Sequence, residues 1–407
     1  MEESKKKKVL VIAPGMEIGG IERSTLGLLD VFDYNAYDVD LFLLAHTGEL
    51  MPFINPNVKL LKEKTIFSDQ YRSFKDLVKS RHFFSILIKA VSKAYSNIRK
   101  SFYGKSNVYM SAYQMLACKF VKKIRKHYDI ALSMFQPHSF LINKVSADLK
   151  VGWVHTDLGS PDNNEDYLFL HSMWSKLNHI ACVSELVLKS FGKLYPDLKD
   201  RLFVFENINF VRLILSQSQE KEVAVEINSP HSILSVGRYD PDKNFDKIPE
   251  MCYRIMKKVK DVKWYIIGYG NAVVEKSIRD SIRKYKLEDR VVILGKKSNP
   301  YPYLKNSTLF VLPSSDEGKS VVVVESQILG TPVVITEYPT SGSQLDDGAD
   351  GIIAPMDFVK CADIITELLC NPERLKQISD CCLSRDYSNS QEIKKIYELY
   401  EREVYPL

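Results

Sequence analysis

Short apolar runs recur along the whole of this 407-residue chain, and segments with helical periodicity lie between many of them. The runs occupy residues 9–14, 39–45, 58–61, 130–135, 151–156 and 179–184 in the first half, and 232–238, 262–268, 290–295, 309–313, 332–336 and 351–355 in the second. Runs of this length are typical of buried strands. Because strands that alternate with helices build parallel sheets, the chain is predicted to be an α/β protein with doubly wound parallel sheets.

The polar stretch SQSQEKE at residues 216–222 interrupts this alternation. At roughly 150 residues per domain, a chain of this length holds two or three cores. We therefore predict an N-terminal Rossmann-like domain over residues 1–210 and a C-terminal one over residues 211–387, facing each other across a cleft. Residues 388–407 have the apolar spacing of an amphipathic helix, which we expect to pack back on the first domain.

Composition excludes several classes of protein. No apolar run approaches the roughly 20 residues that a membrane-spanning helix needs. The basic N-terminus leads into a strand-like run without a signal-peptide cleavage pattern. The seven cysteines are scattered and show no metal-binding spacing, as is usual in a reducing compartment. These features predict a cytoplasmic location.

The motif SSDEGKSVVVVESQILGTPVVIT at residues 314–336 follows a predicted strand, at the edge where open α/β sheets bind ligands. The distance to Gly330 suits a short helix that begins near Lys319, although the valines favour a strand. Free amides at a helix start can bind an anion or sugar hydroxyls, and the carboxylates of Glu317 and Glu325 can accept hydroxyl hydrogen bonds. The alternative is an ordinary loop and helix with two surface glutamates.

Two cations, Arg238 and Lys243, lie on either side of a turn at the end of another predicted strand. Arginine can bind two phosphate oxygens and lysine acts as a point charge, so the pair suits a diphosphate. A solvated basic surface is the alternative. Asp240 and Asp242 also form a D-x-D like that of metal-dependent transferases, but we expect no bound metal.

The glycine loop at residues 15–20 joins the first predicted strand to a helix, which favours close approach of the backbone to phosphate. It lacks the G-x-G-x-x-G spacing of dinucleotide enzymes, and Asp40 lies inside its strand. An NAD dehydrogenase is therefore a poor interpretation. His155 ends a further predicted strand, and a single histidine in such a place is most often structural.

Three of these motifs together resemble the retaining, nucleotide-sugar-dependent glycosyltransferases of family 4, which have two Rossmann-like domains (the GT-B fold). EGKSVVVVESQILGTPVV is similar to the family's E-x7-E element, with Ser326 where the family usually has Ala. GRYDPDK matches its G-R-x4-K, and GGIER its opening G-G-x-E-R. The resemblance covers nearly the whole chain.

This resemblance implies a role for each motif. Glu317 and His155 would contact the donor sugar, Glu325 the ribose hydroxyls, and the diphosphate would lie near Arg238 and Lys243. The remaining donor contacts would come from the backbone or side chains of Gly19, Gly20, Gly295, Lys296, Lys319, Ser320 and Val321. The family generally works without a metal or another cofactor.

The segment from Leu77 to Tyr128 contains twelve Lys or Arg residues and no Asp or Glu. Helical spacing from residue 75 onward predicts one amphipathic helix with a basic side. We predict that this basic side, made of Lys75, Lys79, Lys89, Lys93 and Lys100, is a membrane or acceptor face. A solvated lysine face over a core-facing apolar side is the alternative, and no nucleic-acid module accompanies the charge.

The sequence thus predicts a transferase that moves a hexose or N-acetylhexosamine from a nucleoside diphosphate sugar, most simply a UDP-sugar. The expected acceptor is a lipid-linked or polysaccharide intermediate of a bacterial surface glycan, and the expected place is the inner face of the cell membrane. A non-catalytic nucleotide-sugar-binding subunit and a nucleotide-sugar 2-epimerase are the alternatives.

Overall fold

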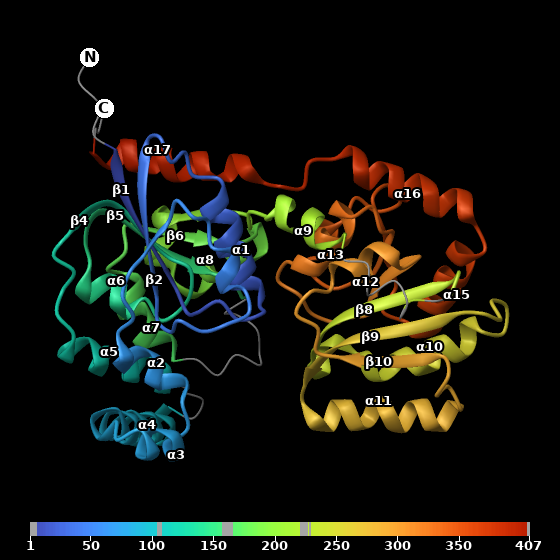
Figure 1. Ribbon diagram of the computed structural model, residues 1–407, viewed down its shortest axis with the longest axis horizontal. Helices are drawn as coiled ribbons and strands as arrows, with labels where there is room; N and C mark the ends of the chain where they lie inside the picture. Colours follow the sequence, from blue (N-terminus) through green and yellow to red (C-terminus); the bar gives the residue numbers. More distant parts are fainter. Residues whose placement is uncertain (1–5, 104–107, 157–165, 220–226, 228, 405–407) are drawn as a thin grey trace. The chain divides into compact units, whose positions relative to one another are not determined.

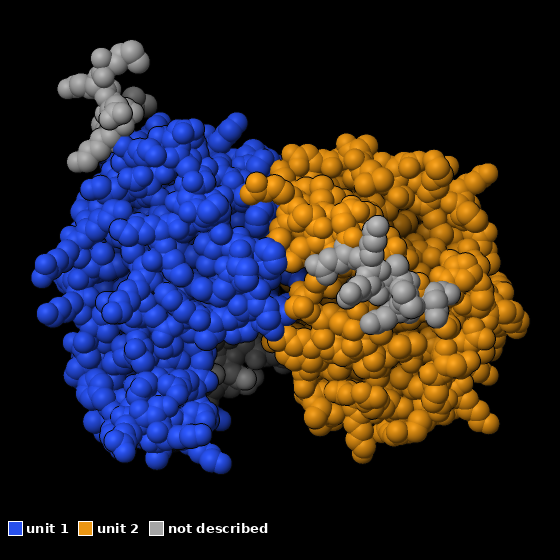
Figure 2. All heavy atoms as spheres, in the orientation of Figure 1, with its two compact units in different colours: residues 1–210, 389–407 blue, residues 211–388 orange. Residues whose placement is uncertain are grey.

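The computed structural model describes residues 6–103, 108–156, 166–219, 227 and 229–404. Two compact units make up the chain (Figure 2). Unit 1 contains Met1–Phe210 and Asn389–Leu407, and unit 2 contains Val211–Ser388. The last segment of the chain therefore belongs with the first 210 residues.

Unit 1 is built on a seven-stranded sheet in the order β3-β2-β1-β4-β5-β6-β7, in which every pairing is parallel. Its strands are β1 (Lys7–Ala13), β2 (Tyr37–Leu43), β3 (Lys59–Leu60), β4 (His127–Ser133), β5 (Ser146–Val154), β6 (His179–Cys182) and β7 (Leu202–Val204). Val9 to Ala13 of β1 are buried, as expected for a central strand that helices cover on both faces.

The helices of unit 1 lie around this sheet, with α3 and α4 at the opposite end from α17 (Figure 1). They are α1 (Gly20–Asp30), α2 (Thr65–Ser68), α3 (Phe74–Lys79), α4 (Phe83–Tyr103), α5 (Tyr109–Phe120), α6 (Ser139–Lys144), α7 (Tyr167–Trp174), α8 (Glu185–Leu194) and α17 (Ile393–Val404). The short 3-10 helices among the described residues of this unit are η1 (Met51–Phe53), η2 (Asp69–Tyr71), η3 (Pro196–Arg201) and η7 (Ser390–Glu392).

Unit 2 is built on a six-stranded parallel sheet in the order β10-β9-β8-β11-β12-β13. The strands are β8 (Ser232–Tyr239), β9 (Lys263–Gly270), β10 (Val291–Gly295), β11 (Leu309–Leu312), β12 (Val333–Thr336) and β13 (Ile352–Ala354). The helices are α9 (Val211–Gln217), α10 (Ile248–Ile255), α11 (Ala272–Tyr285), α12 (Tyr301–Asn306), α13 (Val321–Ile328), α14 (Ser341–Gln344), α15 (Phe358–Leu369) and α16 (Pro372–Ser384), with the 3-10 turns η5 (Pro241–Lys243) and η6 (Phe245–Lys247).

Both sheets confirm the predicted fold class of doubly wound parallel α/β units. In each sheet the strand order reverses once, between β1 and β4 in unit 1 and between β8 and β11 in unit 2. Open α/β sheets bind ligands beyond the carboxyl ends of the strands at such a switch point. The two loops that leave β8 and β11 are therefore the first place to look for a site in unit 2.

The basic segment differs from its prediction in two ways. The predicted single helix is two helices, α3 and α4, because the chain turns at Arg81, whose φ of 59° ends the helical path. Lys75, Lys79, Lys93 and Lys100 are exposed, but the placement of Lys89 on the exposed face is wrong. Lys89 is buried because its ammonium group donates a hydrogen bond to the carbonyl oxygen of Arg72.

Candidate functional site

The loop that leaves β8 carries Arg238 and Lys243 to the switch point of unit 2. Arg238 lies near the end of β8, and the one-turn helix η5 ends at Lys243. Asn244 follows with a left-handed φ of 54°, which asparagine tolerates, and its side-chain amide donates to the carbonyl oxygen of Pro313 at 3.0 Å. The amide of Ser315 donates to the Asp242 carbonyl oxygen at 2.7 Å. These bonds tie the β8 loop to the β11 loop.

Lys243 and Glu317 meet where these two loops join. The ammonium nitrogen of Lys243 lies 2.9 Å from the Glu317 carboxylate and 3.3 Å from that of Asp242. The Glu317 carboxylate also accepts a hydrogen bond from the Ser314 hydroxyl at 2.9 Å, and its carbonyl accepts one from Thr340 at 2.6 Å. We call Asp242, Lys243, Ser314 and Glu317 the switch-point cluster.

Burial and charge act in opposite directions on the cluster's lysine. The side chains of Lys243 and Glu317 are only 16% and 12% exposed. Burial works against the charged form of Lys243, but the carboxylates of Glu317 and Asp242 outweigh it and raise the pKa of the lysine. The cluster therefore holds a permanent cation at the edge of the sheet, where a diphosphate could be bound.

Helix α13 begins next to the cluster, at Val321, two residues after Lys319, near which it was predicted to start. The Ser320 amide, one of the predicted donor-binding amides, donates to the Gln344 side chain at 2.7 Å. The helix ends at Ile328, and the predicted helix stop, Gly330, follows with a φ of +73° that suits glycine. The amide of Thr331 donates back to the Ser326 carbonyl oxygen at 2.9 Å. Tertiary contacts thus outweigh the strand preference of four consecutive valines.

Glu325 lies on α13 and is only 1% exposed. One carboxylate oxygen accepts a hydrogen bond from the Tyr301 hydroxyl of α12 at 3.0 Å. A ribose would therefore have to reach a carboxylate that already has a protein partner. The assignment of Glu325 to the ribose stays a prediction.

The remaining predicted residues of unit 2 lie at the carboxyl ends of neighbouring strands. Arg238 is largely exposed and pairs with Asp240 at 2.9 Å. In the sheet register it lies beside Tyr269 of β9, and the ammonium of Lys296 lies 5.2 Å from the centre of that tyrosine ring. Gly295 ends β10 with a φ of +70° and with open space where a Cβ would be.

The predicted phosphate loop of unit 1 leads from β1 into α1. Gly19 is the N-cap of α1 and Gly20 its first residue, so both lie at the positive end of the helix. A Cβ at Gly19 would collide with the Glu22 carboxylate, and burial raises the pKa of Glu22. A phosphate over Gly19 and Gly20 would therefore have an acidic neighbour, and its binding there stays a prediction.

His155 follows β5, with its Nε2 atom 2.7 Å from the carbonyl oxygen of Met134. Burial lowers the pKa of His155 to about 4, and that of the neighbouring His138 to about 3. Because a carbonyl can only accept, the neutral His155 ring must carry its proton on Nε2, which leaves Nδ1 as a hydrogen-bond acceptor. Such a ring suits contact with a sugar hydroxyl better than contact with a phosphate.

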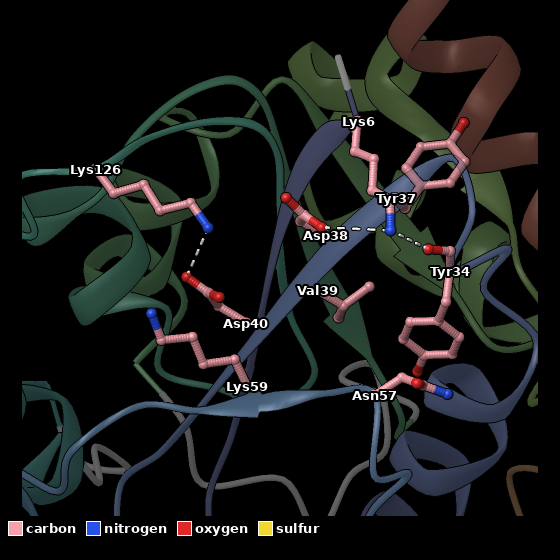
Figure 3. Close-up of a pocket in the computed structure, with 9 residues that line it drawn as sticks. All are labelled: Lys6, Tyr34, Tyr37, Asp38, Val39, Asp40, Asn57, Lys59 and Lys126. Carbon is pink, nitrogen blue, oxygen red and sulfur yellow. Dashed lines mark hydrogen bonds and ion pairs between the residues drawn. The ribbon is translucent and has the colours of Figure 1, made fainter. Parts of the chain in front are cut away.

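A pocket of about 350 Å³ lies at the amino end of β2 in unit 1, and none of the predicted site residues lines it (Figure 3). It is lined by Lys6, Tyr34, Tyr37, Asp38, Val39, Asp40, Asn57, Lys59 and Lys126. Asp40 is buried and bonded to Lys126 at 2.9 Å and to the Tyr128 hydroxyl at 2.7 Å. Both aspartates of the pocket pair with lysines, Asp40 with Lys126 and Asp38 with Lys6, which favours a structural role for them.

Asp240 and Asp242, the D-x-D of the switch point, each pair with a cation, Arg238 and Lys243 respectively. In the described part of the chain, no group of three or more His, Cys, Asp or Glu residues is arranged to hold a metal ion. None of the described helices is both long and apolar enough to span a membrane.

Several residues around the switch-point cluster carry no sequence signal. Tyr301, Thr340 and Gln344 bond to Glu325, Glu317 and Ser320, but they come from segments without a motif. The Tyr338 hydroxyl is buried without a hydrogen-bond partner among the residues that the structure describes. Burial raises the pKa of Tyr338, and so does the charge of Glu317.

Comparison with known proteins finds a family model that matches part of the chain. Residues 216–380 match the family model of glycosyl transferases group 1. The match lies entirely within unit 2 and contains the switch-point cluster, Arg238, Glu325 and Lys296.

Two curated relatives have similar sequences over part of the chain. A Haemophilus influenzae protein named only as an uncharacterized glycosyltransferase is 30% identical over 172 residues, which are 41% of this chain and 47% of that protein. The Campylobacter jejuni N-acetylgalactosamine-N,N'-diacetylbacillosaminyl-diphospho-undecaprenol 4-alpha-N-acetylgalactosaminyltransferase is 33% identical over 127 residues, 31% of this chain and 33% of that protein. The chain thus spans less than half the length of these relatives.

Structural similarity extends over both units. The crystal structure of Anabaena HepE in complex with UDP and glucose has a TM-score of 0.66 to this chain at 15% identity. The similarity covers 96% of this chain and 98% of HepE. The chain therefore has the two-domain Rossmann-like fold of GT-B glycosyltransferase structures.

Proposed function

We propose that the chain is a retaining glycosyltransferase that moves a hexose or N-acetylhexosamine from a UDP-sugar to a lipid-linked or polysaccharide acceptor. The observation that carries this proposal is the ion pair between Lys243 and Glu317. It unites two separate sequence motifs, G-R-x4-K and E-x7-E, at the switch point of the unit that matches the glycosyl transferases group 1 model.

The cluster suggests how a donor would be held. A diphosphate would compete with Glu317 for the ammonium of Lys243, and Arg238, which is exposed, could add a bidentate contact. Once released from Lys243, the Glu317 carboxylate could accept hydrogen bonds from the sugar hydroxyls. In the departing state these cations would stabilise the negative charge that develops on the nucleoside diphosphate.

Three parts of the proposal rest on similarity to other proteins: retention of the anomeric configuration, the nature of the donor, and the nature of the acceptor. Retention follows the resemblance of the E-x7-E element, and no residue stands out as a nucleophile, which favours a front-face substitution assisted by the leaving phosphate. UDP is the nucleotide in the HepE complex, and the Campylobacter relative is named for an acceptor linked to diphospho-undecaprenol. Attachment to the inner face of the cell membrane would bring the enzyme to such an acceptor.

A screen of UDP-, GDP- and ADP-sugars by thermal shift and by nucleotide release tests the proposal. A ligand at a hundredfold excess over its Kd stabilises a protein by about 2.7 kcal/mol, which is easily detected. We expect one nucleotide sugar, a UDP-sugar, to stabilise the wild type and to release its nucleotide slowly. Lys243→Gln should weaken this binding by about tenfold or more, because it removes a charge-assisted phosphate contact.

Lys376→Gln is the matched control, since Lys376 forms an exposed ion pair with Asp380 at 2.9 Å on α16. It should respond to the donor like the wild type. Stabilisation without nucleotide release, even with acceptor extracts, would favour a non-catalytic nucleotide-sugar-binding subunit. Conversion of the donor to an isomeric nucleotide sugar would favour a 2-epimerase. A lack of response to every nucleotide sugar would contradict the assignment of the switch-point cluster.

A further inference from the structure

Helix α4 turns its apolar side to solvent. Residues spaced three or four apart line one face of a helix, and on α4 such a row consists of large apolar side chains. Their exposed fractions run from 39% to 80%. We call this row the apolar stripe: Phe84, Leu87, Val91, Tyr95, Ile98 and Phe102.

A second side of α4, next to the stripe, is mainly polar and packs on the rest of unit 1. Its buried residues are Ser85, Ile88, Lys89, Ser92 and Ser96. The Ser85 hydroxyl donates to the buried carboxylate of Asp69 at 2.5 Å, and Lys89 donates to the carbonyl oxygen of Arg72. Rolling the helix to bury the stripe would break these bonds, so the stripe is held outward by the fold itself.

Neighbouring helices extend the apolar surface. The ring of Phe120, exposed on α5, lies 4.3 Å from that of Phe84. At the other end, Tyr95 lies 6.4 Å from the ring of Phe169 on α7, next to the exposed Leu168. A contiguous apolar surface of this kind is uncommon on a monomeric protein in water and indicates a partner of low polarity.

The charge around the stripe indicates which partner. Lys79, Lys93, Lys100 and Lys119 are exposed near or on the same helices, and no acidic residue occurs from Leu77 to Tyr128. A second copy of this chain could cover the stripe but would leave the positive charge of these lysines unmatched, because a twofold interface offers each copy only the same basic surface. An anionic lipid surface instead offers acyl chains to the stripe and negative headgroups to the lysines.

We propose that α4 lies in the interface of an anionic membrane, with the apolar stripe inserted among the acyl chains and the lysines at the level of the headgroups. This inference deepens the proposed function, because membrane binding would bring the enzyme to a lipid-linked acceptor. It rests on the proposed function only for that acceptor. The proposal differs from the basic membrane face predicted from the sequence. Insertion of the apolar stripe, rather than attraction between lysines and headgroups, supplies most of the binding free energy.

Vesicle flotation tests the proposal with the full chain. The stripe variant is Leu87→Gln, Val91→Gln and Ile98→Gln together, and the charge variant is Lys93→Gln with Lys100→Gln. The control replaces three exposed apolar residues of unit 2, Val273→Gln, Val359→Gln and Leu383→Gln. Each protein is mixed with phosphatidylcholine vesicles with and without phosphatidylglycerol, at low and at high salt.

We expect the wild type and the control to float with the anionic vesicles and to stay bound at high salt. At high salt, which screens charge, the stripe variant should lose about tenfold or more in affinity, and the charge variant only about two- to threefold. Circular dichroism and the unfolding midpoint confirm that the variants fold, which is expected because glutamine is a good helix former on an exposed face.

An inserted tryptophan reports the depth of the stripe. The three native tryptophans, Trp153, Trp174 and Trp264, are all buried, so a surface tryptophan gives a separate signal. Leu87→Trp should show a blue shift and quenching by brominated phosphatidylglycerol vesicles, and Val273→Trp on α11 should show neither.

Three results would overturn the proposal. The first is a wild type that does not float with anionic vesicles, and the second is a stripe variant that floats like the wild type. The third is a wild type that dimerises through the stripe while the tryptophan of Leu87→Trp is not quenched by brominated lipid. The test is independent of donor chemistry: Lys243→Gln should still float, and the stripe variant should still be stabilised by the nucleotide sugar. A failure in flotation and a failure in donor binding are thus distinguishable.

Discussion

Helices α4 and α17 are both amphipathic and both lie on unit 1, but they face it with opposite sides. Helix α17 buries Ile393, Ile396 and Tyr400 and leaves charged residues in solvent. Helix α4 buries mainly serines and a lysine and exposes its phenylalanines, leucine and valine. An amphipathic pattern therefore predicts that a helix has a polar and an apolar side. Which side packs on the protein depends on the residues of the surface beneath the helix.

The surface under each helix explains the difference. Under α17 lie Tyr37, whose ring stacks at 4.5 Å on Tyr397, and the interior strand β5. Under α4 lies Asp69, a buried carboxylate that accepts bonds from Ser85 and His82. A buried carboxylate needs such donors, so it selects the polar side of the helix above it.

The largest expected difference between the two helices is in stability. Ile396→Ser in α17 should lower the free energy of unfolding by about 3–4 kcal/mol, because it leaves a cavity and buries a hydroxyl. Leu87→Ser in the apolar stripe should change it by no more than about 0.5 kcal/mol. Urea unfolding followed by circular dichroism measures both, and equal losses would contradict the outward orientation of α4.

Much of the fold could be predicted from the sequence, because strands of a buried parallel sheet are nearly continuous apolar runs. The runs at residues 9–14 and 309–313 became β1 and β11, for example. The short edge strand β7 at Leu202–Val204 was not predicted, since three half-buried residues leave little pattern. The sequence could not predict which side of α4 packs on the rest of unit 1, because this depends on Asp69, which lies outside the helix.

Asp69 should be the residue on which the orientation of α4 depends most. Asp69→Ala leaves the donors His82, Ser85 and Arg72 without their shared acceptor, and we expect a loss of about 3 kcal/mol in unfolding free energy. Asp38→Ala is the control, because that carboxylate is exposed and lies 4.0 Å from Lys6. Hydrogen exchange of the α4 amides should accelerate in the first variant and not in the second.

The candidate site shows the same division between what local sequence determines and what the fold adds. Motif residues such as Lys243 and Glu317 could be chosen from their spacing, and the fold brings them to 2.9 Å. The bond between Tyr301 and Glu325, and that between Gln344 and Ser320, join segments that no motif connects. Their chemistry is ordinary, and only the sheet order places them beside the motif.

Lys89 tests whether a buried lysine helps to hold α4. Lys89→Met keeps most of the apolar stem but removes the ammonium that bonds to the Arg72 carbonyl, and burial already lowers the pKa of this lysine. We expect a loss of about 1–2 kcal/mol in unfolding free energy, from one carbonyl left unpaired. Lys93→Met, one turn later on the exposed side, should cost less than about 0.5 kcal/mol. If the two substitutions lower the unfolding free energy by the same amount, the hydrogen bond from Lys89 to the Arg72 carbonyl oxygen does not contribute to stability.

The smallest effect is expected at Ser92, in the middle of the buried side of α4. Its hydroxyl is buried and has no hydrogen-bond partner among the residues that the structure describes. Alanine removes this unpaired group and has a higher helix propensity, so Ser92→Ala should stabilise the chain by about 0.5–1 kcal/mol. Ser85→Ala removes a hydroxyl that Asp69 does use, and should destabilise it instead. Opposite signs for two serines on one helix face would show that individual bonds, rather than polarity as such, hold α4 with its stripe outward, whereas equal signs would contradict that explanation.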